Sequence, residues 1–141
     1  MIQWIIETVY RENNQAGNIN YIFCNDEYLN KLNRKYLKHS TLTDILTFDY
    51  SEKKDDGRGT GDENLNDKKN IITGDIFISI DRVKENAKKY NNKFKDELHR
   101  VMIHGILHLL GYNDKTSSEK AIMREKEDFY LSLLKKHNIS E

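Results

Sequence analysis

The stretch from Glu97 to Lys115, ELHRVMIHGILHLLGYNDK, decides how the rest of the chain is arranged. Apolar residues fall on nearly every side of it, which is typical of a helix that is buried all round. His104 and His108 are four positions apart and therefore share one face of that helix, one turn above each other. Because burying polar groups without partners costs free energy, both imidazoles need one. A shared metal ion would satisfy both rings at once.

The residues that follow supply a turn and a third ligand. Gly111 stands where helices commonly end in a left-handed residue, and Asp114 can then fold back toward the ring nitrogens. Two imidazoles and a carboxylate leave coordination positions open, as catalytic zinc sites do. Gly105 occupies the position of the catalytic glutamate in His-Glu-x-x-His metalloproteases. We therefore predict a metal site of His104, His108 and Asp114 at the end of a buried central helix.

The motif His-Gly-x-Leu-His-Leu-x-Gly-Tyr, with a ligand six residues after its second histidine, resembles the YbeY family. Two further segments carry the likeness: residues 32–48 contain LN-x-x-Y and then TD-x-L-x-F, and residues 74–79 read GDIFIS. The chain departs from the family in two places that concern the site. Asp114 stands where the family usually has a third histidine, and Tyr36-Leu37 replaces a Tyr-Arg pair.

The resemblance implies a zinc-dependent endoribonuclease that cleaves single-stranded RNA in rRNA maturation and ribosome quality control. It implies one Zn²⁺ per chain with an open coordination position, and rRNA and the small ribosomal subunit as partners. Under this interpretation residues 1–141 form one YbeY-like domain. The location that we expect is the cytoplasm.

The catalytic groups are less defined by the sequence than the metal ligands. With Gly105 in place of a glutamate, the expected nucleophile is a metal-bound water or a ribose hydroxyl assisted by the metal, and His39, Asp44 and Lys38 are the candidate catalytic side chains. Asp44 could instead cap backbone amides at the start of a strand, and His39 could be a plain loop residue. Arg34, Lys35 and Lys38 form a basic helix face that could contact RNA or simply be solvated.

Composition limits the classes of function that remain. Lys plus Arg and Asp plus Glu number 23 each, so the chain of 141 residues has no overall basic field and must hold a nucleic acid by a local patch. A single cysteine, Cys24, allows no internal disulfide and fits a reducing compartment. No apolar run approaches the ~20 residues of a membrane span, so we expect no membrane partner.

The hydrophobic pattern predicts an α+β fold, a small mixed sheet packed with about five helices. The metal-bearing helix is central in this arrangement. A Thr116-x-x-Glu119 capping box opens a last helix. Its broad apolar face is expected to comprise Ile122, Phe129, Leu131, Leu133 and Leu134. The polar stretch at about 51–70 is expected to be a flexible loop between strands, and its spaced glycines indicate no nucleotide cofactor, since they neither follow a strand nor open a helix. The expected helices are 2–13, 27–38, 82–91, 94–110 and 116–136, and the expected strands are 19–24, 44–50 and 71–80.

Three other functions stay open at this level. The chain could be a non-catalytic ribosome assembly factor whose zinc is structural. It could be a metalloprotease-like hydrolase, although Gly105 leaves such an enzyme without its base. It could also be an Fe(II) oxygenase, because two histidines and one carboxylate form the facial triad of that class.

Overall fold

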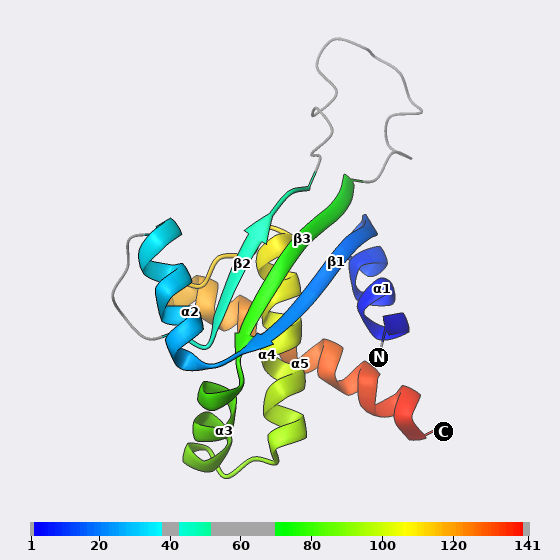
Figure 1. The fold of residues 1–141 in the computed structure, drawn as a ribbon. Helices are drawn as coiled ribbons and strands as arrows, with labels where there is room; N and C mark the ends of the chain where they lie inside the picture. Colours follow the sequence, from blue (N-terminus) through cyan, green and yellow to red (C-terminus); the bar gives the residue numbers. More distant parts are fainter. Residues whose placement is uncertain (1, 38–42, 52–69, 140–141) are drawn as a thin grey trace.

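A mixed sheet forms the centre of this computed structural model, which describes residues 2–37, 43–51 and 70–139 (Figure 1). Within those residues the strand order is β1-β3-β2. The central strand β3 (Asn70–Ser79) pairs in parallel with β1 (Asn14–Cys24) and antiparallel with β2 (Ile45–Asp49). Alternate residues of β3 point into the core, and Ile72, Ile76 and Ile78 are buried there.

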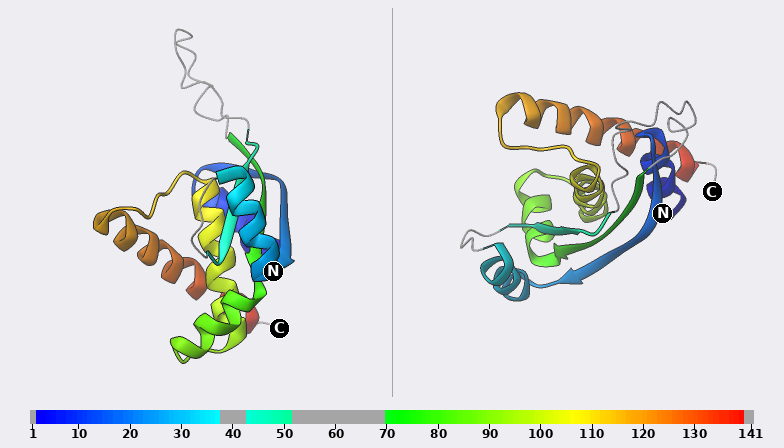
Figure 2. Two further views of the ribbon diagram at one scale, coloured as in Figure 1. Left: turned by 60° about the vertical axis from the view of Figure 1, so that its left-hand side comes forward. Right: turned by 90° about the horizontal axis from the view of Figure 1, so that it is seen from above.

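The helices lie in layers on this sheet. Seen from above (Figure 2, right), α4 (Phe94–Leu109) lies on one face of the sheet, α5 (Ser117–Ile139) lies beyond α4, and α2 (Asp26–Leu32) lies on the opposite face. A π-helical segment, η1 (Asn33–Leu37), continues α2. Helix α3 (Ile80–Lys89) packs beside the first half of α4, and α1 (Ile2–Arg11) lies beside β1. The predicted α+β class, with a small mixed sheet and a buried central helix, is confirmed.

Helix α4 packs tightly against the sheet at Gly105. A Cβ atom added there would lie 2.8 Å from Ile45 Cδ1 and 2.9 Å from Ile76 Cγ2. Side chains on the other faces of α4 are also buried, including Val101, Ile103, Ile106, Leu107 and Leu109. The missing side chain therefore lets the helix backbone rest directly on β2 and β3, which fixes the height of the neighbouring histidines above the sheet.

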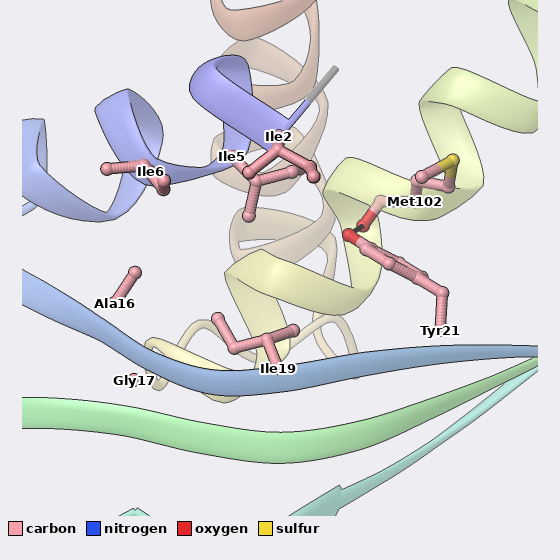
Figure 3. A pocket seen from close by; sticks show the side chains of 8 residues that line it. All are labelled: Ile2, Ile5, Ile6, Ala16, Gly17, Ile19, Tyr21 and Met102. Carbon is pink, nitrogen blue, oxygen red and sulfur yellow. Dashed lines mark hydrogen bonds between the residues drawn. The ribbon is translucent and has the colours of Figure 1, made fainter.

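Helix α1 is anchored at two levels. The Trp4 indole Nε1 donates to the Tyr130 carbonyl of α5 at 2.7 Å. Toward β1 the helix leaves an apolar hollow of about 210 Å³, which Figure 3 shows between α1, β1 and α4. The Tyr21 hydroxyl donates to the Met102 carbonyl at one side of this hollow, at 2.9 Å, and Ile2 and Ile6 stay exposed on the other.

Several predicted boundaries were wrong by a few residues. Strand β1 starts at Asn14, five residues before the predicted residue 19. Its first residues pair in parallel with β3 ahead of a register shift between Ala16 and Ile19, so the strand extends further toward the N-terminus. Helix α3 starts at Ile80, since the Ser79 hydroxyl accepts from the Arg82 amide at 3.3 Å and caps it there. The α-helix predicted over 27–38 ends at Leu32 before the π-helical segment.

The start of α5 follows the predicted capping box, but its buried face differs from the prediction. Thr116 and Glu119 exchange amide hydrogen bonds of 2.9 and 3.1 Å. Ile122 and Phe129 are 48% and 47% exposed, so the prediction that they face the core was wrong. Most of the predicted loop at 51–70 lies outside the described residues. In the part of the chain that the structure describes, no helix has the length and apolar character to cross a bilayer.

Candidate metal centre

The end of α4 presents two imidazoles to each other. The Nε2 atoms of His104 and His108 are 2.9 Å apart, and the ring centroids are separated by 4.5 Å. Both side chains lie at the surface of the buried helix, with 22% and 26% of their area exposed. They can therefore be reached from solvent, although the helix that carries them belongs to the core.

A Schellman turn directs the chain back toward these rings. The Gly111 amide donates to the His108 carbonyl and the Tyr112 amide donates to the Leu107 carbonyl, both at 3.0 Å. Gly111 has a φ of 103°, a left-handed conformation that side chains other than glycine rarely adopt. The predicted glycine stop is thus present, and it places Asp114 beside the two histidines.

The three predicted ligands meet at one point. Asp114 Oδ2 lies 3.2 Å from His104 Nε2 and 3.5 Å from His108 Nε2. Ligand atoms held at about 2.0–2.2 Å from one zinc ion are separated from one another by roughly 3–3.5 Å. The donor set and its spacing therefore fit a single divalent cation, and the cluster of His104, His108 and Asp114 could hold one.

Glu127 of α5 orients His104 from behind. Its Oε2 lies 2.6 Å from His104 Nδ1, and its Oε1 accepts from Arg100 at 2.8 Å. Arg100 also donates to Asp128 at 2.8 Å. A carboxylate at Nδ1 keeps the proton on that nitrogen and leaves the Nε2 lone pair facing the cluster, the arrangement usual for histidines that bind metals.

The two histidines differ in their charge preferences. Burial would lower the pKa of His104, but the hydrogen bond and charge of Glu127, together with Asp114 and Asp44, outweigh burial and raise it. Burial and the neighbouring His104 lower the pKa of His108. These shifts favour the neutral form of the His108 ring over that of His104.

Two hollows meet at this cluster. One, of about 290 Å³, lies between the triad and β2 and is lined by Thr43, Asp44 and Thr47 in addition to the three ligands. The other, of about 560 Å³, lies between the triad and the first turns of α5. Burial raises the pKa of Asp44, which is the carboxyl group on the β2 wall. The cluster therefore faces open space on two sides.

Two of the predicted RNA-binding residues, Arg34 and Lys35, do not lie at this cluster. Arg34 and Lys35 lie exposed on η1 and line neither hollow, and the Lys35 ammonium lies over the Tyr36 ring at 5.2 Å from its centroid. Lys38 and His39 lie outside the described residues. Of the candidate catalytic residues, Asp44 is the one that the structure places beside the triad.

Sequence reasoning missed Glu127. On α5 the buried side chains are Met123, Glu127, Tyr130 and Leu134, so the carboxylate is 5% exposed within an otherwise apolar stripe. An acidic residue on such a stripe must have a buried partner, because an unpaired buried charge is costly. That signal was present in the sequence, but its partners, Arg100 and His104, could be identified only in three dimensions.

A second carboxylate secures the turn that carries Asp114. Glu12, just after α1, accepts hydrogen bonds from the hydroxyls of Tyr112 and Tyr130, and Lys126 donates to it at 3.1 Å. Tyr112 belongs to the Schellman turn, whereas Tyr130 and Lys126 belong to α5. The network thus joins the end of α1, the turn and α5.

Comparisons with known proteins agree over nearly the whole chain. A family model described as "Endoribonuclease YbeY" matches residues 1–135. A protein of that name from Flavobacterium psychrophilum is 48% identical over 132 residues, which cover 94% of this chain and 83% of the relative. One from Cytophaga hutchinsonii is 51% identical over 132 residues, covering 94% and 82%. The solution structure of TM1509 from Thermotoga maritima matches 92% of this chain and 75% of that one, at 29% identity and a TM-score of 0.57.

Proposed function

Because the chain belongs to the YbeY family, we propose that it is an endoribonuclease that hydrolyses phosphodiester bonds of single-stranded RNA with the help of a metal ion. One observation carries the proposal. Three ligand atoms from the end of α4 and the turn after it lie 2.9–3.5 Å apart, at the junction of two hollows open to solvent. A structural metal site would instead be closed by four protein ligands.

We propose that the metal is zinc, held by His104, His108 and Asp114. Two imidazoles and a carboxylate are ligands that zinc takes in catalytic sites. Zinc bound there supplies Lewis acidity that polarises a phosphoryl oxygen and activates water. The rest of the chemistry depends on the protein side chains around the site.

Those side chains have distinct roles in the proposal. Glu127, anchored by Arg100, fixes the tautomer and orientation of His104. Asp44 faces the same hollow as the triad, and its raised pKa suits a carboxyl group that holds or moves a proton during phosphodiester cleavage. Gly105 allows close helix packing and takes no part in proton transfer.

The substrate that we propose is rRNA, cleaved during maturation of the small ribosomal subunit and in ribosome quality control. Support comes from the likeness of three separate sequence segments to the YbeY family and from relatives named as endoribonucleases. The cytoplasmic location expected from the sequence stays a prediction.

The test is cleavage of end-labelled RNA by purified protein whose metal content is measured by elemental analysis. We expect single-stranded RNA to be cut and a duplex of the same sequence to be spared. Chelation, His108→Ala and Asp114→Ala should each abolish cutting, and zinc should restore the chelated wild type. Cutting that survives in both variants, or that a chelator leaves unchanged, would disprove the proposed mechanism.

A further inference from the structure

The hollow on the α5 side of the triad carries cationic side chains that the proposed chemistry does not use. We call it the α5 groove; its lining includes His104, Asp114, Ser117, Lys120, Met123 and Arg124. In Figure 2 (left) the first turns of α5 stand away from α4 on the far side of an extended connection. The groove occupies about 560 Å³ beside the ligands, which is larger than the hollow on the β2 side.

Lys120 and Arg124 are available to an outside anion. Arg100 forms ion pairs with Glu127 and Asp128, and Lys126 forms one with Glu12. By contrast, neither Lys120 nor Arg124 has a carboxylate within ion-pair distance in the described ranges, and both are exposed. The groove therefore presents two unpaired positive charges to solvent.

The acidic groups of the groove are already occupied. Glu127 is bound by Arg100 and His104, and Asp114 faces the two imidazoles. Glu119, next to Lys120, is engaged by Thr116 at the helix cap. Lys120 and Arg124 therefore form no ion pair with these carboxylates, and both cations can contact an incoming anion.

The spacing of the two cations suits a repeating anion. Residues four apart lie on one face of a helix and differ in height by about 6 Å, so Lys120 and Arg124 can contact successive groups of a flexible chain. The chain as a whole has no net charge, so RNA affinity has to come from a local patch.

From these observations we propose that the α5 groove binds backbone phosphates of the RNA strand next to the bond that is cleaved. This inference rests on the proposed nuclease function and adds the path of the substrate. The strand would enter along α5, cross the triad and leave through the hollow lined by β2. Recognition by Lys120 and Arg124 is then electrostatic and independent of base sequence.

The test measures RNA binding without cleavage. Fluorescence anisotropy of a labelled oligouridine, recorded in EDTA over a series of salt concentrations, gives the affinity and its salt dependence. Lys120→Gln combined with Arg124→Gln should weaken binding about 25-fold at roughly 0.1 M salt and reduce the slope of log K against log salt by about 1.4, which corresponds to two lost phosphate contacts.

Two matched variants control for general effects of charge. Lys84→Gln with Lys88→Gln removes two exposed lysines with the same spacing from α3, which packs beside the opposite end of α4, and should bind like wild type. Lys120→Arg with Arg124→Lys keeps both charges in the groove and should bind nearly as well as wild type. Circular dichroism of every variant confirms that it is folded.

Each result decides between the two proposals. If the α5 double variant binds like wild type, or if the α3 pair weakens binding as much, the α5 groove is not the phosphate site. Wild-type protein that binds RNA through Lys120 and Arg124 but cannot cut it with zinc would leave this inference standing and disprove the nuclease proposal. Wild-type protein that neither binds RNA nor cuts it would disprove both the phosphate-binding inference and the nuclease proposal.

Discussion

His104 is the residue on which the candidate metal centre depends most, because both of its ring nitrogens contact other side chains of the site. Nδ1 lies 2.6 Å from Glu127 and Nε2 lies 2.9 Å from the Nε2 of His108. The ring therefore cannot rotate or change tautomer without breaking a buried contact to α5. By comparison Asp114, at the surface of the turn, is 39% exposed and is held by fewer contacts.

The first prediction concerns the support of this ring. Glu127→Gln keeps the size of the side chain but removes the charge that holds the proton on Nδ1 and pairs with Arg100. We expect zinc affinity to fall by about 10- to 100-fold, the usual loss when such a partner is changed. Competition with a chromophoric chelator measures the affinity. The control is Asp128→Asn, which removes the other, more exposed contact of Arg100 and should leave zinc binding unchanged.

The second prediction concerns proton transfer. Asp44→Asn should lower kcat for RNA cleavage by about 10²- to 10⁴-fold, the usual contribution of a general acid or base. The zinc content should stay at the wild-type level, because Asp44 is not one of the three ligands. Asp49→Asn, at the exposed other end of β2, serves as the matched control. Full activity of Asp44→Asn with zinc bound would exclude the carboxyl group from the reaction.

At the scale of elements, the contact of α4 with the sheet sets the position of the site. The third prediction is that Gly105→Ala destabilises the protein, because the added methyl overlaps with Ile45 and Ile76 at a cost of about 1–3 kcal/mol. The gain of about 1 kcal/mol that alanine brings to a helix offsets part of this cost, so the net loss is up to about 2 kcal/mol. Urea denaturation of the wild-type and variant proteins measures the difference in the free energy of unfolding.

Ile45→Val provides a second site for a double-mutant cycle with Gly105→Ala. The substitution removes Cδ1, the atom closest to the added methyl, so the double variant should be more stable than the sum of the two single changes predicts. Strict additivity would mean that the helix is not seated against Ile45 as described.

The elements also show which parts of the fold a sequence reveals. The buried helix, its glycine stop and the three ligands follow from residues close in sequence, so periodicity and turn chemistry suffice to predict them. The full length of β1 depends on pairing with β3, which is distant in sequence. Ile122 and Phe129 are exposed because the opposite face of α5 is buried. That face carries Glu127, which contacts Arg100 and His104, two residues distant in sequence.

At the scale of the molecule, Glu12 links the first helix to the last. Burial would raise its pKa, but hydrogen bonds from Tyr112, Tyr130 and Lys126 outweigh this and lower the pKa below 4.5. A lowered folded-state pKa stabilises the protein fully above the unfolded-state pKa, and this contribution is lost as pH falls through the folded-state value.

The fourth prediction follows from that sign. Glu12→Gln should lower the free energy of unfolding by about 1–3 kcal/mol at neutral pH, and the difference from wild type should shrink as pH falls below 4.5. Thermal or urea unfolding across a pH series measures it. Glu27→Gln is the control, since its exposed pair with Lys31 contributes little. A difference that does not change with pH would mean that the Glu12 charge is not the source of the stability.

The residues that would bind and orient the proposed zinc ion all lie between Arg100 and Asp128, whereas the sheet joins segments as distant as Asn20 and Asp75. An unfolded chain therefore keeps its ligands near one another and retains some affinity for zinc. We compare the free energy of unfolding in saturating zinc with that in EDTA. The increase should be smaller than RT ln(1 + [L]/Kd), where [L] is the free zinc concentration and Kd is the dissociation constant of the native protein. A gain that matches the calculation would show that only the native protein holds the ion. A gain smaller than calculated would mean that zinc can bind the α4–α5 segment of a newly made chain before its sheet has formed.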